Sequence, residues 1–335
     1  MSLSMNKNIA VGIGIGTIVT AAASISYRRL STYVPPKVWA AKPALGAFAA
    51  INKPTAGPSS EIALPRGKHP FQLYSLGTPN GVKVTILLEA LVDAYPGFEY
   101  DAWLVRIDGG QFGSDFVKIN PNSKIPCAYD YGEGKGEGKS EPTRLFESAS
   151  IMLHLVEQYD KKGIFLPTDK RAEIMNWIFW AQGSAPFLGG GFGHFYNYAP
   201  VKIEYAIDRY AMEAKRQLDV LNRALGGLDG GPYSGGPFIC GDEVTLADMV
   251  IFPWYGNVCL GKLYAGSDTF LSVESDYPHV CAWAKRMFEL DYVQRGRKVN
   301  RPFGPDEDQL HNRHEKSDFL TNTQDKVKAR EAKSV

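Results

Sequence analysis

The pattern of hydrophobic and polar positions divides the chain into a mixed segment followed by a helical one. Residues 71–75 (FQLYS) alternate as a short strand does, and a cluster of turn-forming residues, 77–81 (GTPNG), comes next. Pro79 suits the first turn of a helix, and the apolar positions behind it have the spacing of an amphipathic helix: Val84, Leu87, Leu88 and Leu91. Residues 100–105 predict a second strand, so the segment opens as β-α-β.

Two further strands and a helix complete the mixed segment. The strands are expected at residues 125–129 and 144–146, on either side of residues 131–142 (YGEGKGEGKSEP). That insertion is rich in glycine and charge, which indicates a mobile solvent loop without a function. Ser148 begins the helix, whose apolar face consists of Ile151, Met152, Leu155, Val156 and Tyr159.

Beyond residue 167 the strand pattern stops and helical periodicity replaces it. Thr245 and Asp248 form a capping box that opens an apolar helix running through Trp254. An earlier helix has a core-facing stripe of Ala214, Leu218, Leu221 and Leu225. A βαβ-ββα unit therefore precedes an all-α unit. We divide the chain into an N-terminal extension (31–70), a mixed domain (71–166), a helical domain (167–300) and a charged tail (301–335) whose composition is poor for a packed core.

Residues 1–30 form a separate apolar segment. Residues 9–25 (IAVGIGIGTIVTAAASI) carry no charge and lie between Lys7 and the pair Arg28 and Arg29. This length is at the lower limit for a helix that crosses a bilayer, which needs roughly 17 to 25 residues. A signal peptide, an organelle-targeting sequence and a transmembrane anchor all fit. We expect membrane attachment through residues 9–25 or organelle targeting, with a cytoplasmic protein as the alternative, and we expect catalysis without residues 1–30.

Composition excludes several classes of function. Lys plus Arg (37) almost balance Asp plus Glu (36), which gives no electrostatic case for a nucleic-acid partner. The cysteines lie far apart, with no CxxC pair and no histidine at a metal-ligand spacing: Cys127, Cys240, Cys259 and Cys281. We therefore expect no metal and no dithiol redox motif, but buried thiols in a reducing compartment.

Five long strings carry a resemblance to a known family. They are SLGTPNGVKVTILLEAL, NPNSKIP, LFESASI, MNWIFWAQGSAPFLGGGFGHFYNYAPVKIEYAIDRY and CGDEVTLADMVIFPW. Together they resemble the nu-class, disulfide-bond-reductase type of glutathione transferase of bacteria and fungi, from about residue 38 to residue 323. The resemblance implies an α/β thioredoxin-like N-terminal domain followed by an all-α C-terminal domain. It also implies glutathione as substrate or co-substrate, other small thiols and disulfides as partners, and a homodimer.

The expected glutathione pocket lies at turns and helix ends of the first domain. The resemblance implies a cis peptide between Ile125 and Pro126, which exposes the Ile125 backbone for pairing with the peptide of glutathione. Lys124 is expected to bind the glycyl carboxylate, with a solvated surface charge as the alternative role. Ser148, near a helix N-terminus, donates to the γ-glutamyl carboxylate and Glu147 accepts from the ammonium, although Ser148 could instead be an ordinary N-cap. Gln111 and Asn52 are carried over from the family alone.

The thiolate of glutathione must be stabilised by other groups, because neither tyrosine nor cysteine follows the first strand. Thr78 and Asn80 stand there instead. Lowering a thiol pKa from about 8.5 to about 6.5 requires roughly 2.7 kcal/mol. One or two hydrogen bonds to a charged acceptor, at about 1.5 to 3 kcal/mol each, are enough. We therefore expect Thr78 and Asn80 to be catalytic, with helix capping alone as the alternative role of Thr78.

Residues 186–200 (PFLGGGFGHFYNYAP) are too aromatic and too rich in glycine for a simple connector. Their aromatic side chains could cover a cleft, about half of them being core, and His194 is expected to be structural. Tyr198 is assigned to a second glutathione or to substrate. Arg209 matches a family position that contacts a second glutathione, although a helical arginine is more often a surface charge.

Three functions follow from this reasoning. The first is glutathione-dependent reduction of small disulfides, with two glutathione molecules in one site. The second is conventional conjugation or peroxide reduction with a single glutathione. The third is a non-catalytic, glutathione-binding regulatory role, which the composition of residues 31–70 does not favour because they lack an Asn/Gln-rich arm.

Overall fold

The computed structural model describes residues 34–41, 51–132 and 141–333 of the chain. They belong to two units, which divide between Pro43 and Ala44. Residues 34–41 fall in the first unit and contain neither helix nor strand. The helices and strands of the described residues all lie in the second unit.

A four-stranded sheet forms the mixed domain, in the order β2-β1-β3-β4. The first strand, β1 (Phe71–Ser75), runs parallel to β2 (Asp101–Leu104) and antiparallel to β3 (Cys127–Asp130). The fourth, β4 (Thr143–Phe146), pairs antiparallel with β3. A parallel pair needs a crossover, and α2 (Pro79–Ala94) supplies it between β1 and β2. The alternating pattern therefore predicted these strands correctly, and the thioredoxin-like arrangement is confirmed.

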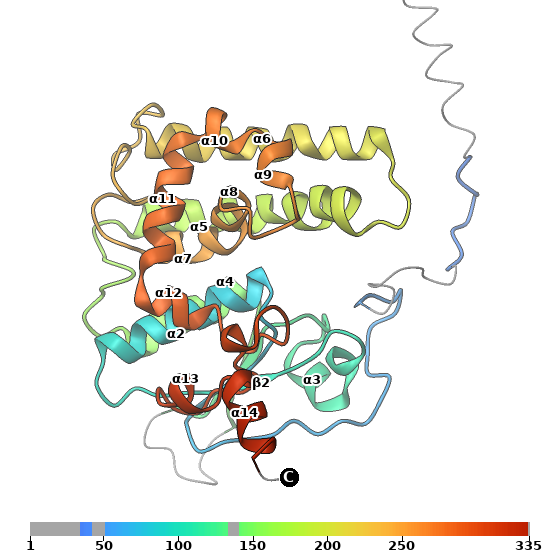
Figure 1. Ribbon diagram of the computed structural model, residues 1–335, viewed down its shortest axis with the longest axis vertical. Helices are drawn as coiled ribbons and strands as arrows, with labels where there is room; N and C mark the ends of the chain where they lie inside the picture. Colours follow the sequence, from blue (N-terminus) through green and yellow to red (C-terminus); the bar gives the residue numbers. More distant parts are fainter. Residues whose placement is uncertain (1–33, 42–50, 133–140, 334–335) are drawn as a thin grey trace, which may run out of the picture. The chain divides into compact units, whose positions relative to one another are not determined.

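Helix α2 is buried on all sides, although its sequence predicts a single apolar stripe. Every residue from Gly81 to Leu91 is buried. The reason is that α2 packs against α4 (Ser148–Tyr159) of the same domain and against α7 (Leu246–Ile251) and α12 (Asp291–Gly296) of the helical domain (Figure 1). A Cβ atom added at Gly296 of α12 would lie 2.7 Å from the backbone of Ile86, so the two helices almost touch. Two charged residues of α2, Lys83 and Glu89, are consequently buried in the protein interior.

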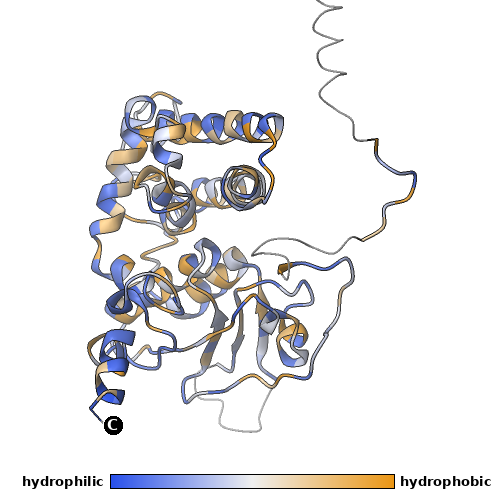
Figure 2. Cartoon of the chain, turned by 45° about the vertical axis from the view of Figure 1, so that its right-hand side comes forward, coloured by the Kyte–Doolittle hydropathy of each residue, from blue (hydrophilic) through white to orange (hydrophobic). Residues whose placement is uncertain are grey.

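The helical domain holds one long helix, α6 (Glu204–Leu225), whose predicted stripe of four apolar residues is buried as expected. In Figure 2 hydrophobic and hydrophilic residues recur along this helix at the top of the view, as an amphipathic helix requires. The other elements, in chain order, are α5 (Arg171–Pro186), η3 (Phe187–Tyr198), α7 (Leu246–Ile251), η4 (Phe252–Gly256), α8 (Asn257–Cys259), α9 (Ser267–Phe270), α10 (Val273–Asp276), α11 (Pro278–Glu289) and α12 (Asp291–Gly296). Both η3 and η4 are π-helical.

The capping box predicted at the start of α7 is present, with Thr245 and Asp248 bonding each other's backbone. The helix does not continue regularly to Trp254, however. It changes to π-helix at Phe252, next to Pro253, which has no N–H to donate to the preceding turn. This change of pitch determines where the Trp254 side chain lies.

Residues 51–70 of the N-terminal extension follow the surface of the mixed domain. Its backbone bonds η2 (Gly110–Phe112) and α3 (Ser114–Ile119), with Ser59 N donating to Phe112 O at 2.9 Å and Ser114 N donating to Ser60 O at 2.9 Å. The Tyr74 hydroxyl donates to Pro65 O at 2.7 Å. These contacts bring Ile51 to the edge of the cavity described below.

The charged tail packs well, contrary to what its composition suggests. It contains η5 (Asp306–Asp308), α13 (Asp318–Thr321) and α14 (Gln324–Glu331). Leu310 and Arg313 are fully buried. Arg313 Nε donates to Glu89 Oε1 at 3.1 Å, and Arg295 Nε donates to Glu89 Oε2 at 2.7 Å. The tail therefore packs on α2 through the buried ion pair of Arg313 with Glu89, a carboxylate that Arg295 of the helical domain shares.

Membrane attachment through residues 9–25 requires correction. Residues 1–33 lie outside the described residues. Within residues 34–41, 51–132 and 141–333, no helix combines the length and the apolar character needed to cross a bilayer. The assignment of a membrane-anchored or transmembrane protein is withdrawn on this finding.

Candidate active site

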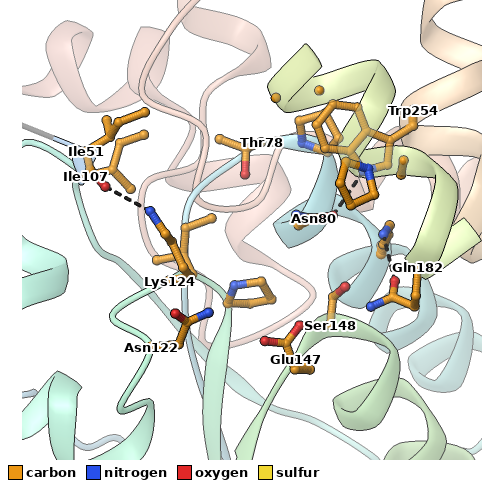
Figure 3. Close-up of a pocket in the computed structure, with 18 of the residues that line it drawn as sticks. Ile51, Thr78, Asn80, Ile107, Asn122, Lys124, Glu147, Ser148, Gln182 and Trp254 are labelled. Atoms are coloured by element: carbon orange, nitrogen blue, oxygen red, sulfur yellow. Dashed lines mark hydrogen bonds between the residues drawn. The ribbon is translucent and has the colours of Figure 1, made fainter. Parts of the chain in front are cut away.

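A cavity of about 530 Å³ opens between the mixed and the helical domain. The start of α2, the turn before β3 and the start of α4 form one wall, and α5, η3 and Trp254 form the other (Figure 3). Most of the residues selected from the sequence line it: Thr78, Asn80, Gln111, Lys124, Ile125, Glu147, Ser148 and Tyr198. Asn52 and Arg209 are exposed and are not among the lining residues. Their assigned roles therefore have no support from this geometry.

Thr78 stands at the N-cap of α2 with an extended backbone, but its side chain makes no capping hydrogen bond. Capping alone therefore does not account for the hydroxyl, which remains available to a ligand. The glycine in the first turn is also required, because a Cβ atom at Gly81 would lie 2.1 Å from Leu76 O. The unpaired N–H groups of this turn and the helix dipole favour an anion beside Thr78.

Asn80 is oriented by a residue of the helical domain that the sequence reasoning did not select. Trp254 Nε1 donates to Asn80 Oδ1 at 3.0 Å (Figure 3). An indole N–H can only donate, so the amide must present its carbonyl oxygen to Trp254, which leaves the Asn80 NH₂ as a donor. Gly189 makes room for the indole, since a Cβ atom there would lie 2.6 Å from Trp254 Cη2.

The peptide between Ile125 and Pro126 is cis, as the family resemblance implied. Within the described residues, no hydrogen bond engages the backbone N–H or C=O of Ile125. The turn is held by Asn120, whose Nδ2 donates to Lys124 O at 2.6 Å. Lys124 Nζ donates to Ile51 O at 2.9 Å (Figure 3), and partial burial lowers the Lys124 pKa. The turn therefore offers an unpaired backbone segment beside a cation.

Glu147 is the N-cap of α4, and its φ of 68° lies in the left-handed region. This conformation costs a non-glycine residue roughly 1 to 3 kcal/mol, and such strain is common at ligand sites. Ser148 is buried and is the first helical residue, so the alternative that it is merely the N-cap is wrong. The strained turn presents the Glu147 carboxylate beside the Ser148 hydroxyl at the cavity wall (Figure 3).

Lys83 is the second lining residue that the sequence reasoning missed. It is 1% exposed, and its Nζ donates to Gln182 Oε1 on α5 at 3.3 Å. Burial lowers its pKa to about 7, and the charge of Glu147 partly opposes this shift. The apolar stripe of α2 places Lys83 on the polar face, so no local pattern identifies it as a pocket residue.

Gln111 and Tyr198 shape opposite parts of the cavity. Gln111 bonds its own loop, with Nε2 donating to Ile107 O at 2.9 Å and Oε1 accepting from Gly109 N at 3.1 Å. Tyr198 ends η3, and its ring lies 5.6 Å from that of Tyr264. Burial raises the pKa of Tyr198. The expected aromatic cover is therefore formed only in part by η3, whose Phe192 belongs to the core.

None of the four cysteines is among the residues that line the cavity. Cys127, Cys240 and Cys281 are buried, as predicted, and Cys259 is half-buried. Burial raises the pKa of Cys240 to about 12 and that of Cys127 well above its ordinary value. Cys240 and Cys127 are therefore protonated at neutral pH and cannot serve as nucleophiles there, whereas a hydrogen bond from Cys259 lowers the pKa of Cys281, which lies outside the cavity wall. Across the described residues, no cluster of His, Cys, Asp and Glu could hold a metal ion.

Comparison with known proteins identifies the family. A family model described as the glutathione S-transferase C-terminal domain matches residues 204–286. The disulfide-bond oxidoreductase YghU of Escherichia coli K12 is 57% identical over 301 residues, which cover 88% of this chain and 98% of that protein. This chain belongs to the glutathione transferase family. The resemblance inferred from the five strings is thus confirmed.

Two solved glutathione transferases share the fold and carry ligands. The YghU transferase of Streptococcus pneumoniae, complexed with glutathione, is 49% identical, with a TM-score of 0.71 over 80% of this chain and 97% of that one. A family member from Pseudomonas fluorescens with two glutathione molecules bound is 32% identical, with a TM-score of 0.57 over 68% and 92% of the two chains. This chain thus belongs to a family whose members bind glutathione, and no cysteine lines its own cavity.

Proposed function

We propose that this glutathione transferase reduces small disulfides with two molecules of glutathione. The observation that carries the proposal is a cavity lined by thiolate-stabilising groups but by none of the four cysteines. The attacking sulfur must therefore come from a bound thiol rather than from the protein. The disulfide-bond oxidoreductase relative and the relative with two bound glutathione molecules support this proposal.

The first glutathione would occupy the wall formed by the mixed domain. Its thiolate would accept hydrogen bonds from the Thr78 hydroxyl and the Asn80 NH₂ at the start of α2, where the helix dipole adds to the stabilisation. Its peptide would pair with the free backbone of Ile125, and its γ-glutamyl end would meet Glu147 and Ser148.

The reaction would proceed in two exchanges. The first glutathione thiolate attacks one sulfur of the disulfide, forms a mixed disulfide and releases the other sulfur as a thiolate, which takes up a proton. The thiolate of the second glutathione then attacks the glutathione sulfur of the mixed disulfide. Glutathione disulfide forms, and the second substrate thiolate leaves and is protonated. Holding both thiols in one cavity raises their effective concentration.

The decisive experiment is the stoichiometry of the reaction. We expect purified protein to form one glutathione disulfide for each disulfide consumed, at a rate far above the uncatalysed exchange. An aromatic halide and a hydroperoxide, each tested at the same glutathione concentration, should react much more slowly. Faster turnover of either compound would contradict the proposal and favour the single-glutathione chemistry. No turnover of any of the three, combined with tight glutathione binding, would favour a regulatory protein.

We also propose that the chain forms a homodimer through α5 and α6. Phe179 on α5 is 65% exposed and Met212 on α6 is 69% exposed, so both helices offer apolar surface that a partner subunit could cover. Solution scattering of the wild type should give the mass of a dimer. The double substitution Phe179→Glu and Met212→Glu should give a monomer, and a monomeric wild type would contradict the proposal.

A further inference from the structure

A second cavity of about 490 Å³ adjoins the first one at the thiolate position. Six residues line both cavities: Thr78, Pro79, Ile107, Tyr198, Leu263 and Tyr264. A molecule whose sulfur lies beside Thr78 could therefore extend its other end into the second cavity. Part of the remaining wall of this cavity is formed by residues that follow α8 and α12, far from the predicted glutathione groups in the sequence.

Three cations line the second cavity, and no acidic residue does. They are Lys262, Arg297 and Arg301, hereafter the basic cluster. In the described part of the chain, none of the three forms an ion pair with a carboxylate. Instead Lys262 Nζ and Arg297 Cζ lie 4.6 and 4.5 Å from the ring centre of Phe288. These cation–π contacts fix the two side chains without neutralising them.

The basic cluster is electrostatically unfavourable in the absence of an anion. Burial and, to a smaller extent, the like charge of Arg301 together lower the pKa of Arg297 to about 10. Asp308 has the opposite influence on Arg297, but its Oδ1 pairs with Lys298 at 3.3 Å. Arg301 Nε donates only to the backbone oxygen of Phe303, at 2.9 Å. An anion in the cavity would satisfy these donors and relieve the repulsion.

We infer that the basic cluster binds a carboxylate of the disulfide substrate, so that this enzyme prefers disulfides that carry acidic groups. The inference rests on the proposed disulfide reduction and names its substrate class. The disulfide bond would lie at the shared wall beside Thr78, and the acidic arm would extend to Arg297 and Arg301. Lys124 lines the first cavity, so a cation is available to an anionic ligand there as well.

The test compares three disulfides of similar size that differ in charge. These are the disulfides of mercaptopropionate, mercaptoethanol and cysteamine, which are anionic, neutral and cationic. Wild-type kcat/KM should be highest for the anionic compound. Arg301→Gln and Arg297→Gln should each lower that value about tenfold, the size of one lost charge-assisted hydrogen bond, and leave the neutral compound nearly unchanged. Either variant alone suffices if the other fails to fold.

Arg223→Gln is the matched control, because Arg223 lies on α6 and lines neither cavity. It should leave all three rates at the wild-type level. The cluster variants could instead lose kcat/KM equally for the anionic and the neutral disulfide and recover it at a higher glutathione concentration. That result would assign the basic cluster to the second glutathione and overturn the inference. Unchanged charge selectivity in both cluster variants would overturn it as well.

Calorimetry separates this inference from the proposed function. If the wild type reduces no disulfide, the proposed function fails whatever the basic cluster does. Binding of mercaptopropionate disulfide in the presence of S-methyl glutathione then tests the cluster by itself. The inference predicts binding about tenfold weaker in Arg301→Gln than in the wild type and in Arg223→Gln. Equal binding in all three proteins would refute it.

Discussion

The indole of Trp254 and the amide of Asn80 join the two domains at the proposed thiolate site. They are separated by 174 residues in sequence, and Trp254 Nε1 lies 3.0 Å from Asn80 Oδ1. We expect Trp254→Phe to raise the pKa of the bound glutathione thiol, since an unfixed amide can turn its oxygen toward the sulfur. The ultraviolet absorbance of the thiolate, followed against pH, measures this directly. The shift should be about one pH unit, the equivalent of roughly 1.4 kcal/mol.

A double-mutant cycle shows whether the indole acts through Asn80. In an Asn80→Ala background, Trp254→Phe should have no further effect on the thiol pKa. Gly189→Ala, which displaces the indole without touching its N–H, should reproduce the shift in the wild-type background. Additive effects in the cycle would mean that Trp254 contributes only packing.

Removal of the Thr78 hydroxyl should reduce turnover without unfolding the protein, because the hydroxyl caps nothing. Thr78→Ala should lower kcat by about one to two powers of ten, which corresponds to a loss of roughly 1.5 to 3 kcal/mol. Thr78→Ser keeps the hydroxyl and should retain most of the rate. A full rate and an unshifted pH profile in Thr78→Ala would show that the hydroxyl does not stabilise the thiolate.

Lys83 should make stability depend on pH above neutrality. Its folded pKa of about 7 lies below the ordinary value of 10.5, so between these pH values the unfolded chain binds the proton that the folded chain releases. The free energy of unfolding of the wild type should therefore rise with pH between these two pKa values. Below the lower value the full cost of burying the charged lysine, roughly 5 kcal/mol, remains. Lys83→Met should stabilise the protein at acidic pH and less so near pH 10. Urea unfolding at several pH values tests this, with the exposed Lys118→Met as control.

Glu89 should be essential for folding, because it joins α2 to the tail. Glu89→Gln leaves Arg313, which is fully buried, with a weaker partner, and breaking such a pair costs about 3 to 5 kcal/mol. Glu157→Gln is the control, since Glu157 pairs with Arg171 at 3.7 Å on the surface. That control should lose less than about 1 kcal/mol in urea unfolding. Similar losses in the two variants would contradict the role of the buried network.

The features that the sequence predicted correctly depend on residues that lie close together in the chain. Strand alternation, the stripe of α6 and the Thr245 capping box are local patterns, and each was confirmed. The Ile125 turn and the Glu147 and Ser148 pair were found because their motifs are continuous strings. The strained φ of Glu147, in contrast, has no signature in composition or periodicity.

The misses all concern contacts between distant segments. Lys83 is buried beside the cavity and bonds Gln182 on α5, a residue 99 positions further along the chain. Trp254 reaches Asn80 only because η4 changes pitch at a proline. Arg209 was carried over from a family pattern, yet it is exposed on α6. The pattern of hydrophobic and polar positions indicates which residues could face a cavity. It does not show which helix packs over them.

The central claim is that glutathione, and not the protein, supplies the sulfur that attacks the disulfide. The most direct test is disulfide reduction by a variant in which all four cysteines are replaced by serine or alanine, with folding checked by thermal unfolding. Because no cysteine lines the cavity, we expect kcat/KM within about threefold of the wild-type value and the same yield of glutathione disulfide. A folded cysteine-free protein without activity would contradict the account.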